Sequence, residues 1–427
     1  MKVEKRFFFL ALISLGLGGL FAFLVALART PGIYKLFPPG YFYHALVGHV
    51  DLAIVVFLLS FTMLLWNKFF PAEDSVSFYL AFFGFLGIAL ASFSGWGIAV
   101  SNNYLPTIVH PVFFFGALSF FCGLWLASII RLKTVFRSIF SKDPLINSLS
   151  VSVILAFLML LATLTSAFKT GSHDALYLFY ERLYWAPGHI HQFLNGAVLL
   201  FSWYFLSKLL GIKHELGFLR FANMSFLLFG FLLVLVPVIF EDPVSRNAKI
   251  FTELSYAIGL GIPIFLHVFN LLRKSVLSTS PYSLAFWLSV SLYLLGIVIA
   301  YAGLKADLRV PAHYHGAVTS LTLTLMAISY YLFKEYGWIR EFPKIAKPQL
   351  FLYGFGMILF VLGLYFAGFK GAPRKTYGTG FTEDPFVLFS LVLMMVGTVF
   401  AVISGVMFVI YMLKTGLKAK YANLSAN

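Results

Sequence analysis

The chain has 427 residues, of which 60% are hydrophobic and only 11% are charged, and its mean hydropathy is +0.91. This composition excludes a water-soluble core of this size and predicts a polytopic membrane protein. The formal net charge of +15 comes from basic residues in the loops. We attribute it to membrane topology and attraction to anionic lipid, and it gives no support for nucleic-acid binding.

Twelve apolar segments are each long enough to cross a bilayer, which takes about 20 residues. They predict an all-α fold of twelve transmembrane helices in a single membrane domain over residues 1–427, with no room for a soluble domain. The predicted spans are Phe7 to Ala28, His44 to Trp66, Phe78 to Val100, Thr107 to Ile130, Leu149 to Phe168, His189 to Leu209, Phe221 to Phe240, Ile250 to Leu272, Ser283 to Leu304, Val310 to Phe333, Leu350 to Phe369 and Phe386 to Leu413.

The basic loop residues fall on one side of this topology, as in the loops around Arg131 and Lys344. Cytoplasmic loops are the ones enriched in lysine and arginine, so both termini are expected in the cytoplasm. We expect a multi-pass protein of a prokaryotic cytoplasmic membrane whose first span is retained, since no small-residue cleavage site follows it. Cys122 is the single cysteine, which excludes a disulfide within the chain.

Histidines are unusually placed along the spans. Six of them lie near the predicted outer ends of four spans: His49, His110, His189, His191, His313 and His315. Ionisable groups inside a membrane are costly and usually functional, so this shared layer predicts a site. Four others lie elsewhere: His44 at the interface, His267 toward the inner half, and His173 and His214 in loops.

The pair His313 and His315 in PAHYHGAVTS is the most informative of these. Residues two apart on an α-helix are rotated by about 200°, so the two imidazoles leave opposite faces of one helix. One helix can therefore supply a ligand to each of two metal centres.

Five motifs, in this order along the chain, together resemble the catalytic subunit I of heme-copper oxidases, the family that includes cytochrome c oxidases and nitric oxide reductases. They are GHVDLAIVVF, WAPGH, IPIFLHVF, AHYHG and GAPRK. The resemblance covers most of the twelve spans and implies a heme-copper oxidase subunit I-like bundle.

The resemblance implies two hemes, with b-type favoured. His313 would be the proximal ligand of a high-spin heme, while His49 and His315 would be the axial ligands of a low-spin heme. A bis-histidine heme suits electron transfer because no substrate can reach its iron, whereas a heme with one histidine keeps an open face for a gas. Arg374 and Lys375 would neutralise the heme propionates.

The same resemblance implies that Trp185 and His189 match a tryptophan and a copper ligand, and that His267 replaces a proton-pathway lysine. Two departures put a copper or other second metal in doubt. The span from Phe221 to Phe240 has no histidine, where the family takes two copper ligands, and Phe193 stands where oxidases carry a crosslinked tyrosine.

Several alternatives stay open around this second metal. His191 is either a proton relay or a substitute ligand. In a different register, HQFLNG follows the HxxxEG outline of nitric oxide reductases, with His191 as the ligand and Asn195 in place of the acidic residue. Glu241 and Asp242 either help to bind a non-heme iron or form an interfacial acidic turn. His110 is either a further ligand or a buried, hydrogen-bonded side chain.

The function that these features favour is a respiratory-chain oxidoreductase that reduces oxygen or nitric oxide. Electrons would enter from a small donor subunit, a cytochrome c or a cupredoxin on the outer face. The alternative is a heme protein without copper or catalysis, in electron transfer or gas sensing. A twelve-helix secondary transporter is disfavoured, because such proteins tend to show internal repeats that are absent here.

Overall fold

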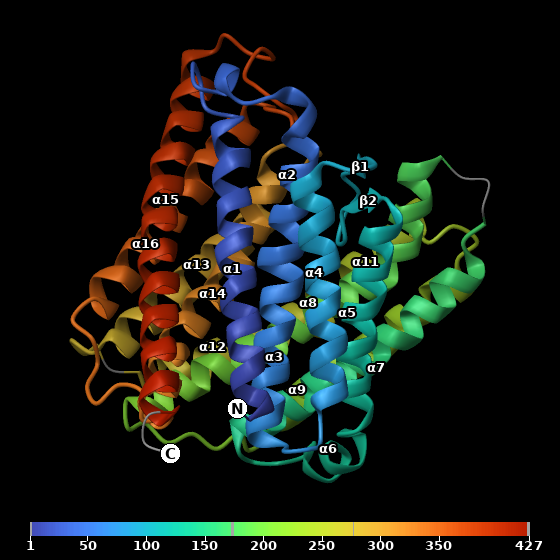
Figure 1. The fold of residues 1–427 in the computed structure, drawn as a ribbon. Helices are drawn as coiled ribbons and strands as arrows, with labels where there is room; N and C mark the ends of the chain where they lie inside the picture. Colours follow the sequence, from blue (N-terminus) through green and yellow to red (C-terminus); the bar gives the residue numbers. More distant parts are fainter. Residues whose placement is uncertain (1, 172–174, 276, 425–427) are drawn as a thin grey trace. The chain divides into compact units, whose positions relative to one another are not determined.

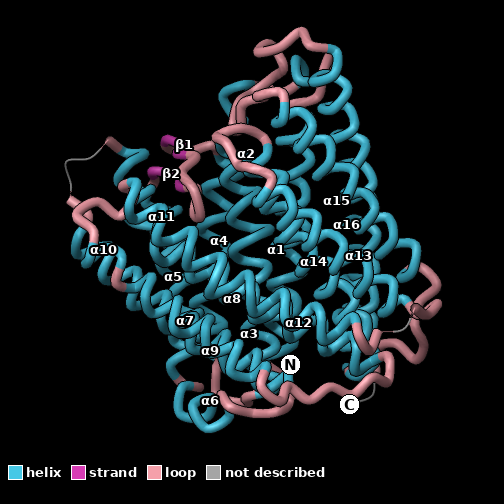
Figure 2. Tube along the Cα trace, turned by 180° about the vertical axis from the view of Figure 1, so that it is seen from behind, coloured by secondary structure: helices cyan, strands magenta, loops and turns pink. Residues whose placement is uncertain are grey.

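The computed structural model describes residues 2–171, 175–275 and 277–424, so His173 lies outside the described residues. They form a helical protein with one short two-stranded hairpin (Figures 1 and 2). Two compact units divide the chain: a first unit of residues 1–11 and 50–275, and a second unit of residues 12–49 and 276–427. A single domain over 1–427 stays a prediction, and two long helical runs contribute residues to both units.

The first unit holds most of the helices between residues 50 and 275. Its elements are η3 (Asp51–Val56), α3 (Phe57–Phe69), α4 (Ser75–Ser94), β1 (Ile98–Val100), β2 (Thr107–Val109), α5 (Pro111–Ile129), α6 (Leu132–Ser138), α7 (Pro144–Lys169), α8 (Leu176–Leu209), α9 (Leu219–Val234), α10 (Val236–Ile239), α11 (Arg246–Ser255), η4 (Tyr256–Gly261) and α12 (Ile262–Leu272). The segments η3 and η4 are π-helical, a conformation that is frequent at functional sites. Helices α4 and α5 pack along each other, as do α7 and α8.

The second unit is built from the remaining elements. They are most of α1 (Val3–Leu27), the 3₁₀ turns η1 (Tyr34–Leu36) and η2 (Pro39–Tyr41), α2 (Phe42–Val50), α13 (Pro281–Tyr301), α14 (Arg309–Glu335), α15 (Ala346–Phe369) and α16 (Pro385–Leu424). Helices α15 and α16 run side by side, in orange and red (Figure 1). Helix α14 packs against both α13 and α15, which places its histidines inside this unit.

Each of the twelve predicted spans contains a helix or a helical run, so the all-α membrane fold is confirmed. Eleven of these runs are long and apolar enough to cross a membrane. The exception is α8, which contains the predicted span from His189 to Leu209. Its buried polar residues His189, His191 and Asn195 lower its hydropathy, and the same residues make it a candidate for function.

Three predicted span boundaries were wrong. The spans from Phe78 to Val100 and from Thr107 to Ile130 were drawn too long, because α4 ends at Ser94 and α5 begins at Pro111. The residues between them form the antiparallel β1–β2 hairpin, magenta in Figure 2, in which Ile98 pairs with Val109. Helix α8 begins at Leu176, well before His189, because Pro187 lies inside the helix instead of ending it.

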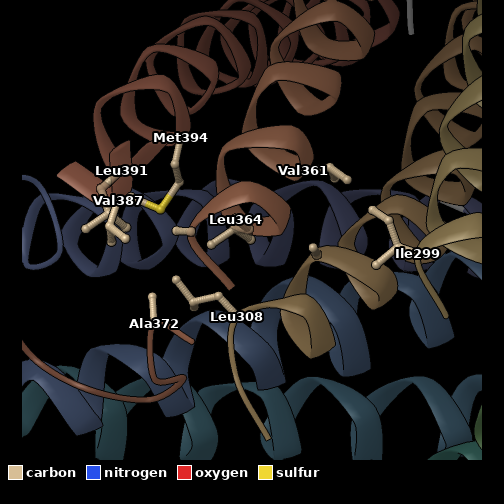
Figure 3. Packing of buried hydrophobic residues seen from close by; sticks show 10 residues of the cluster. Ile299, Leu308, Val361, Leu364, Ala372, Val387, Leu391 and Met394 are labelled. Carbon is tan, nitrogen blue, oxygen red and sulfur yellow. The ribbon is translucent and has the colours of Figure 1, made fainter. Parts of the chain in front are cut away.

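Close packing fixes the start of α14, just before its two histidines. A buried apolar cluster in the second unit includes Leu308 and Ile299, together with Leu364 of α15 and Met394 of α16 (Figure 3). Farther along α14, a Cβ on Gly296 would lie 2.8 Å from the carbonyl oxygen of His313. Helices α13 and α14 therefore touch backbone to backbone at this level.

Candidate functional site

His49 of α2 and His315 of α14 face each other in the second unit. Their rings are nearly parallel, with an interplanar angle of 10° and ring centroids 6.0 Å apart. His49 Nδ1 lies 3.2 Å from the Gly18 carbonyl oxygen, and His315 Nδ1 lies 2.7 Å from that of Pro311. Because a carbonyl oxygen only accepts, both Nδ1 atoms carry the hydrogen. Each Nε2 therefore keeps its lone pair, the arrangement of a metal-binding histidine.

This geometry fits a metal ion held between the two rings. Two imidazoles bound through nitrogen at about 2 Å, on opposite sides of one ion, place their ring centres roughly 6 Å apart. The observed separation is 6.0 Å. Both side chains are only partly covered by protein atoms, although they lie on packed helices. The pair therefore suits a bis-histidine iron.

His313 contacts a different helix from His315. Its Nδ1–H donates to the carbonyl oxygen of Gly296 on α13 at 2.8 Å. The ring of His315, in contrast, lies 4.9 Å from that of Phe360 on α15. The rotation of about 200° between the two residues explains why they contact separate helices. Among the described residues His313 Nε2 has no hydrogen-bond partner, so it too is available to a ligand.

Basic residues gather around Tyr314, between the two histidines. Arg374, a predicted site residue, and Arg29, which the sequence reasoning missed, both interact electrostatically with Tyr314. Arg29 is only 5% exposed, donates to the Pro373 carbonyl oxygen at 2.7 Å, and leaves its Nε without a partner. Burial lowers the pKa of Arg29 to about 10. A buried guanidinium that pairs with no carboxylate among the described residues fits an anionic group of a ligand.

The loop that carries Arg374 and Lys375 is firmly anchored. Lys375 adopts a left-handed backbone conformation with φ 56°. The Tyr377 hydroxyl lies 2.7 Å from the carbonyl oxygens of Tyr34 and Phe37, and the Gly378 amide donates to Ala28 at 2.9 Å. These bonds hold the loop against the segment after α1, which contains Arg29. No local pattern in the sequence points to Arg29, because its hydrogen-bond partner Pro373 is 344 residues away in the chain.

In the first unit, His189 has both ring nitrogens engaged. Its Nδ1–H donates to the carbonyl oxygen of Trp185, and its Nε2 lies 2.6 Å from the Tyr104 hydroxyl. Since Nδ1 carries the hydrogen, Nε2 must accept and Tyr104 must donate. The nitrogen that a copper ion would need is thus occupied, and the arrangement around His189 does not fit the copper ligand that the resemblance implies. Tyr104 is a second residue that the sequence reasoning missed.

His191 and Asn195 lie one helical turn apart on α8 and, unlike His189, have polar atoms without a hydrogen-bond partner among the described residues. They are 6% and 8% exposed, and His191 Nε2 and both amide atoms of Asn195 are buried without a hydrogen-bond partner among the described residues. A buried polar atom left unpaired costs about 1–3 kcal/mol, so this face of α8 fits a polar ligand. Of the two registers, the geometry favours the one that aligns His191 and Asn195.

A complete ligand set for copper is not assembled around either histidine. Among the described residues there is no group of three or more histidine, cysteine, aspartate or glutamate side chains placed to hold a metal ion. His110 caps the start of α5, where its Nδ1 accepts from the Val112 amide at 3.3 Å. His110 is therefore hydrogen-bonded at Nδ1, as in the second alternative, but its side chain is only partly buried.

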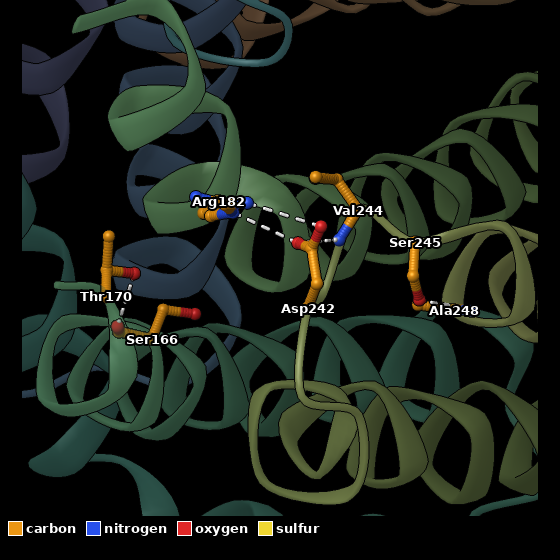
Figure 4. Close-up of polar contacts among 7 residues, drawn as sticks. All are labelled: Ser166, Thr170, Arg182, Asp242, Val244, Ser245 and Ala248. Carbon is orange, nitrogen blue, oxygen red and sulfur yellow. Dashed lines mark hydrogen bonds and ion pairs between the residues drawn. The ribbon is translucent and has the colours of Figure 1, made fainter. Parts of the chain in front are cut away.

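The acidic pair Glu241 and Asp242 lines a cavity of about 610 Å³ at the end of α10. Asp242 accepts from Arg182 Nε at 3.0 Å and from Nη2 at 3.3 Å, and it also accepts from the Val244 amide (Figure 4). The hydrogen bonds from Arg182 lower the pKa of Asp242. Among the described residues, no histidine lines the cavity. The residues form an acidic turn with an ion pair, as in the second of the two alternatives above.

His267 lies in a closed hydrogen-bond network of the first unit and is fully buried. Asn270 donates to the Tyr204 hydroxyl at 3.1 Å, Tyr204 donates to His267 Nδ1 at 2.8 Å, and His267 Nε2–H donates to Asn223 Oδ1 at 2.9 Å. Asn223 in turn donates to Asn147. The network joins α7, α8, α9 and α12, and both nitrogens of His267 are satisfied.

Residues 2–407 match the family model of cytochrome c and quinol oxidase polypeptide I. The chain is 40% identical over 347 residues to an uncharacterized protein of Aquifex aeolicus (strain VF5), which covers 80% of this chain and 87% of that protein. It is 26% identical over 498 residues to an uncharacterized protein of Rickettsia prowazekii (strain Madrid E), with 96% of each covered. Its fold is similar to that of a heme-copper terminal oxidase dimer solved by cryo-EM, with a TM-score of 0.73 and 17% identity over 97% of this chain and 83% of the other.

Proposed function

Because the chain belongs to the cytochrome c and quinol oxidase polypeptide I family, we propose that it is a heme-binding membrane oxidoreductase that passes electrons from a low-spin to a high-spin heme to reduce oxygen or nitric oxide. The observation that carries this proposal is the facing pair of His49 and His315, whose ring centroids are 6.0 Å apart. Their Nδ1–H groups are held by backbone carbonyls, so both Nε2 atoms are oriented for iron without a change of tautomer.

Each remaining residue of the second unit has a proposed task. His313 Nε2 would hold the iron of the second heme, while the Gly296 carbonyl accepts from His313 Nδ1 and keeps its ring in place. Arg374, Lys375 and Arg29 neutralise the propionates, which are anions in a poor solvent. The hemes, with b-type favoured, would supply one-electron chemistry and bind the gas. The polypeptide sets the orientation of the rings and the charge around them.

In the first unit we propose different roles for His189, His191 and His267. His191 and Asn195 provide unpaired polar atoms that can receive a substrate or a second metal. His267 is proposed as a proton-handling residue, and proton movement through it would require its bonds to Tyr204 and Asn223 to exchange. A copper at His189 would require Tyr104 to leave Nε2, so we route no step through copper there.

A second candidate function is electron transfer or gas sensing by the hemes without catalysis. One observation favours it, which is the lack of a three-residue metal cluster in the part of the chain that the structure describes. The two functions differ in turnover. An oxidase or reductase consumes oxygen or nitric oxide continuously in the presence of a reduced donor, whereas a sensor binds the gas without converting it.

The surroundings proposed for this protein are a prokaryotic cytoplasmic membrane with both termini in the cytoplasm. The electron donor would be a small subunit, a cytochrome c or a cupredoxin at the outer face. Eleven apolar helical runs support the bilayer as the immediate environment. The positive loops support the orientation.

The optical spectrum of the purified protein tests the proposal, recorded oxidised, reduced, and reduced under carbon monoxide, with iron and copper analysis on the same sample. We expect two hemes, one low-spin and unreactive and one that binds carbon monoxide. Turnover with a reduced donor separates the enzyme from the sensor. Protein expressed with ample heme that shows no heme absorbance would overturn both functions.

A further inference from the structure

We propose that the cavity at the ends of α7 and α10 binds the headgroup of phosphatidylethanolamine. In this site the lipid ammonium pairs with Glu241, and the lipid phosphate is bound by Lys169 and the first turn of α11. Three features of the first unit carry the inference: the depth of the cavity in the membrane, the arrangement of its charges, and the apolar surface beside it. None of the residues proposed above for heme binding or proton handling lines the cavity among the described residues, so the inference goes beyond the proposed function.

The cavity lies at the level of lipid headgroups. Its volume is about 610 Å³, and one wall is formed by residues 169–171, directly after the predicted span that ends at Phe168. A second wall is formed by residues 239–243, where the predicted span that ends at Phe240 is followed by a polar turn. Both spans run outward in the predicted topology, so their ends mark the outer boundary of the hydrocarbon core. A cavity at two such ends faces the interfacial layer that holds the headgroups.

The charged residues that line the cavity balance one another and leave two charges free. Arg182 donates to Asp242 through two hydrogen bonds, of 3.0 and 3.3 Å (Figure 4). Lys169 and Glu241 also line the cavity, and neither forms an ion pair with the other or with any other described residue. One unpaired ammonium and one unpaired carboxylate in the same cavity complement a zwitterion. A purely anionic ligand would instead lie beside two carboxylates.

The polar groups of the cavity distinguish ethanolamine from choline. A primary ammonium can donate charge-assisted hydrogen bonds to the Glu241 carboxylate, whereas the quaternary nitrogen of choline has no N–H group. The phosphate accepts from the Lys169 ammonium. Ser245 caps α11 and Asn247 lies in its first turn, where backbone amides without an intrahelical partner carry partial positive charge. These amides add to the attraction for a phosphate.

Exposed apolar side chains extend the site toward the hydrocarbon core. Phe168 of α7 is 88% exposed, and Ile239 of α10, which also lines the cavity, is 59% exposed. Leu164 and Val238, on the same two helices, are exposed as well. Because α7 and α10 contact each other, these side chains offer an acyl chain a surface next to the polar cavity. A lipid uses both parts of the site, whereas a water-soluble zwitterion uses only the cavity.

Native mass spectrometry of the full chain in detergent tests the site, after delipidation and addition of one palmitoyl-oleoyl phospholipid at a time. The wild type should bind one phosphatidylethanolamine about tenfold more tightly than phosphatidylcholine or phosphatidylglycerol. Glu241→Gln should remove the preference over phosphatidylcholine, and Lys169→Gln should weaken the binding of both lipids. Glu383→Gln and Lys305→Gln are the matched controls, because both residues are exposed in loops of the second unit, and these variants should bind as the wild type does.

A chemical label on the unaltered chain keeps the test decisive if a variant folds poorly. A carbodiimide joins the Glu241 carboxylate to the lipid amine as an amide, and the water that is lost converts the carbodiimide to a urea. Peptide mass spectrometry should find this adduct with phosphatidylethanolamine and not with phosphatidylcholine. Equal affinity for the three lipids, an adduct that is absent from Glu241, or displacement of the lipid by an equal concentration of water-soluble phosphoethanolamine would overturn the lipid site.

Discussion

At the scale of single residues, four histidines share the hydrogen bond at Nδ1 and differ in the partner of Nε2. His49, His189, His313 and His315 each have Nδ1 within hydrogen-bond distance of a backbone carbonyl. For His189 and His315 this carbonyl belongs to the residue four positions earlier in the same helix, and for His49 and His313 it belongs to another helix. In each case the hydrogen bond fixes the tautomer. What differs is Nε2, which accepts from Tyr104 in His189 and has no hydrogen-bond partner among the described residues in the other three. A histidine whose Nε2 has no partner can bind a metal, whereas a histidine whose Nε2 already accepts a hydrogen bond cannot do so without losing that bond.

Loss of either axial imidazole should remove one heme signal selectively. His49→Ala and His315→Ala are expected to abolish the low-spin spectrum and leave carbon monoxide binding by the second heme intact, because His313 contacts a different helix. Reduced-minus-oxidised difference spectra measure the effect. His110→Ala serves as the control, since it caps α5 and should keep both signals. Simultaneous loss of both hemes in His49→Ala would contradict separate ligation.

Removal of a cation near the hemes should lower their midpoint potential. A positive charge beside the propionates disfavours the oxidised, more positive iron, so Arg374→Ala and Arg29→Gln should each shift the potential downward by tens of millivolts. Redox titration followed optically gives the shift. Arg340, an exposed residue after the far end of α14, is the control, and Arg340→Gln should leave the potential unchanged. Unchanged potentials in both site variants would remove these residues from the propionate site.

Two arginine–aspartate pairs of the first unit should contribute very different amounts to the free energy of unfolding. Arg131 lies 2.9 Å from Asp74, and both side chains are almost fully buried. Arg182 lies 3.0 Å from Asp242, with side chains 24% and 37% exposed. Arg131→Ala leaves the buried Asp74 carboxylate without its cation, although Asn67 still donates to it. This change should cost about 3–5 kcal/mol, whereas Arg182→Ala should cost less than about 1 kcal/mol.

Unfolding of the detergent-solubilised variants measures this difference, with wild type in the same micelles. Heme content is recorded in parallel so that loss of ligand is not mistaken for loss of the ion pair. Equal destabilisation by the two substitutions would mean that burial does not decide the strength of these pairs.

At the scale of elements, direct contact between helix backbones sets the position of the histidines. A Cβ on Gly296 would lie 2.8 Å from the His313 carbonyl oxygen and 2.9 Å from the Ala317 amide nitrogen. Because these are backbone atoms, an added Cβ could be accommodated only if one helix shifted against the other. Helix α14 therefore depends on a glycine in α13 to bring His313 to its hydrogen-bond partner.

Gly296→Ala should push α14 away from α13 and cost about 1–3 kcal/mol, the usual range for overpacking. The heme bound through His313 should be affected first, seen as weaker or heterogeneous carbon monoxide binding. Gly405→Ala on α16 is the matched control, because an added Cβ would meet nothing within 4 Å. If both variants behave as wild type, the contact between α13 and α14 does not position His313.

At the scale of the whole molecule, ligand binding and folding should be coupled. The chain keeps buried polar atoms that no described residue satisfies, among them His191 Nε2, Asn195 and Arg29 Nε. Such groups favour a folded state that contains its ligands. The protein is thus expected to be less stable when heme is withheld during expression.

Heme-depleted protein should unfold at a lower temperature than the heme-loaded form. A ligand that binds only the folded state adds about 4 kcal/mol when its free concentration is a thousand times the dissociation constant. Thermal melts of the two preparations, followed by tryptophan fluorescence, measure the difference. Identical melting temperatures at full and zero heme occupancy would show that heme contributes nothing to the fold.

The amino-acid sequence by itself determined the membrane class and the helices, and it predicted the candidate ligand residues of the second unit. Hydropathy located all twelve helical runs, because burial in lipid needs a run of apolar residues that any window along the chain detects. The spacing of His313 and His315 predicted that they contact different helices, because helical rotation is a local property. The family resemblance added His49, Arg374 and Lys375 as residues to examine.

Only the tertiary structure decided which histidine nitrogens are free. Tyr104 reaches His189 from 85 residues away, through a left-handed residue in the loop between two predicted spans. Arg29 joins the loop of Arg374 across 344 residues. His267 is hydrogen-bonded to Tyr204 of α8 and Asn223 of α9, and the sequence around His267 does not predict these partners. Hydrogen-bond partners depend on distances of a few ångströms between segments remote in the chain, and a sequence pattern encodes only the order of residues along it.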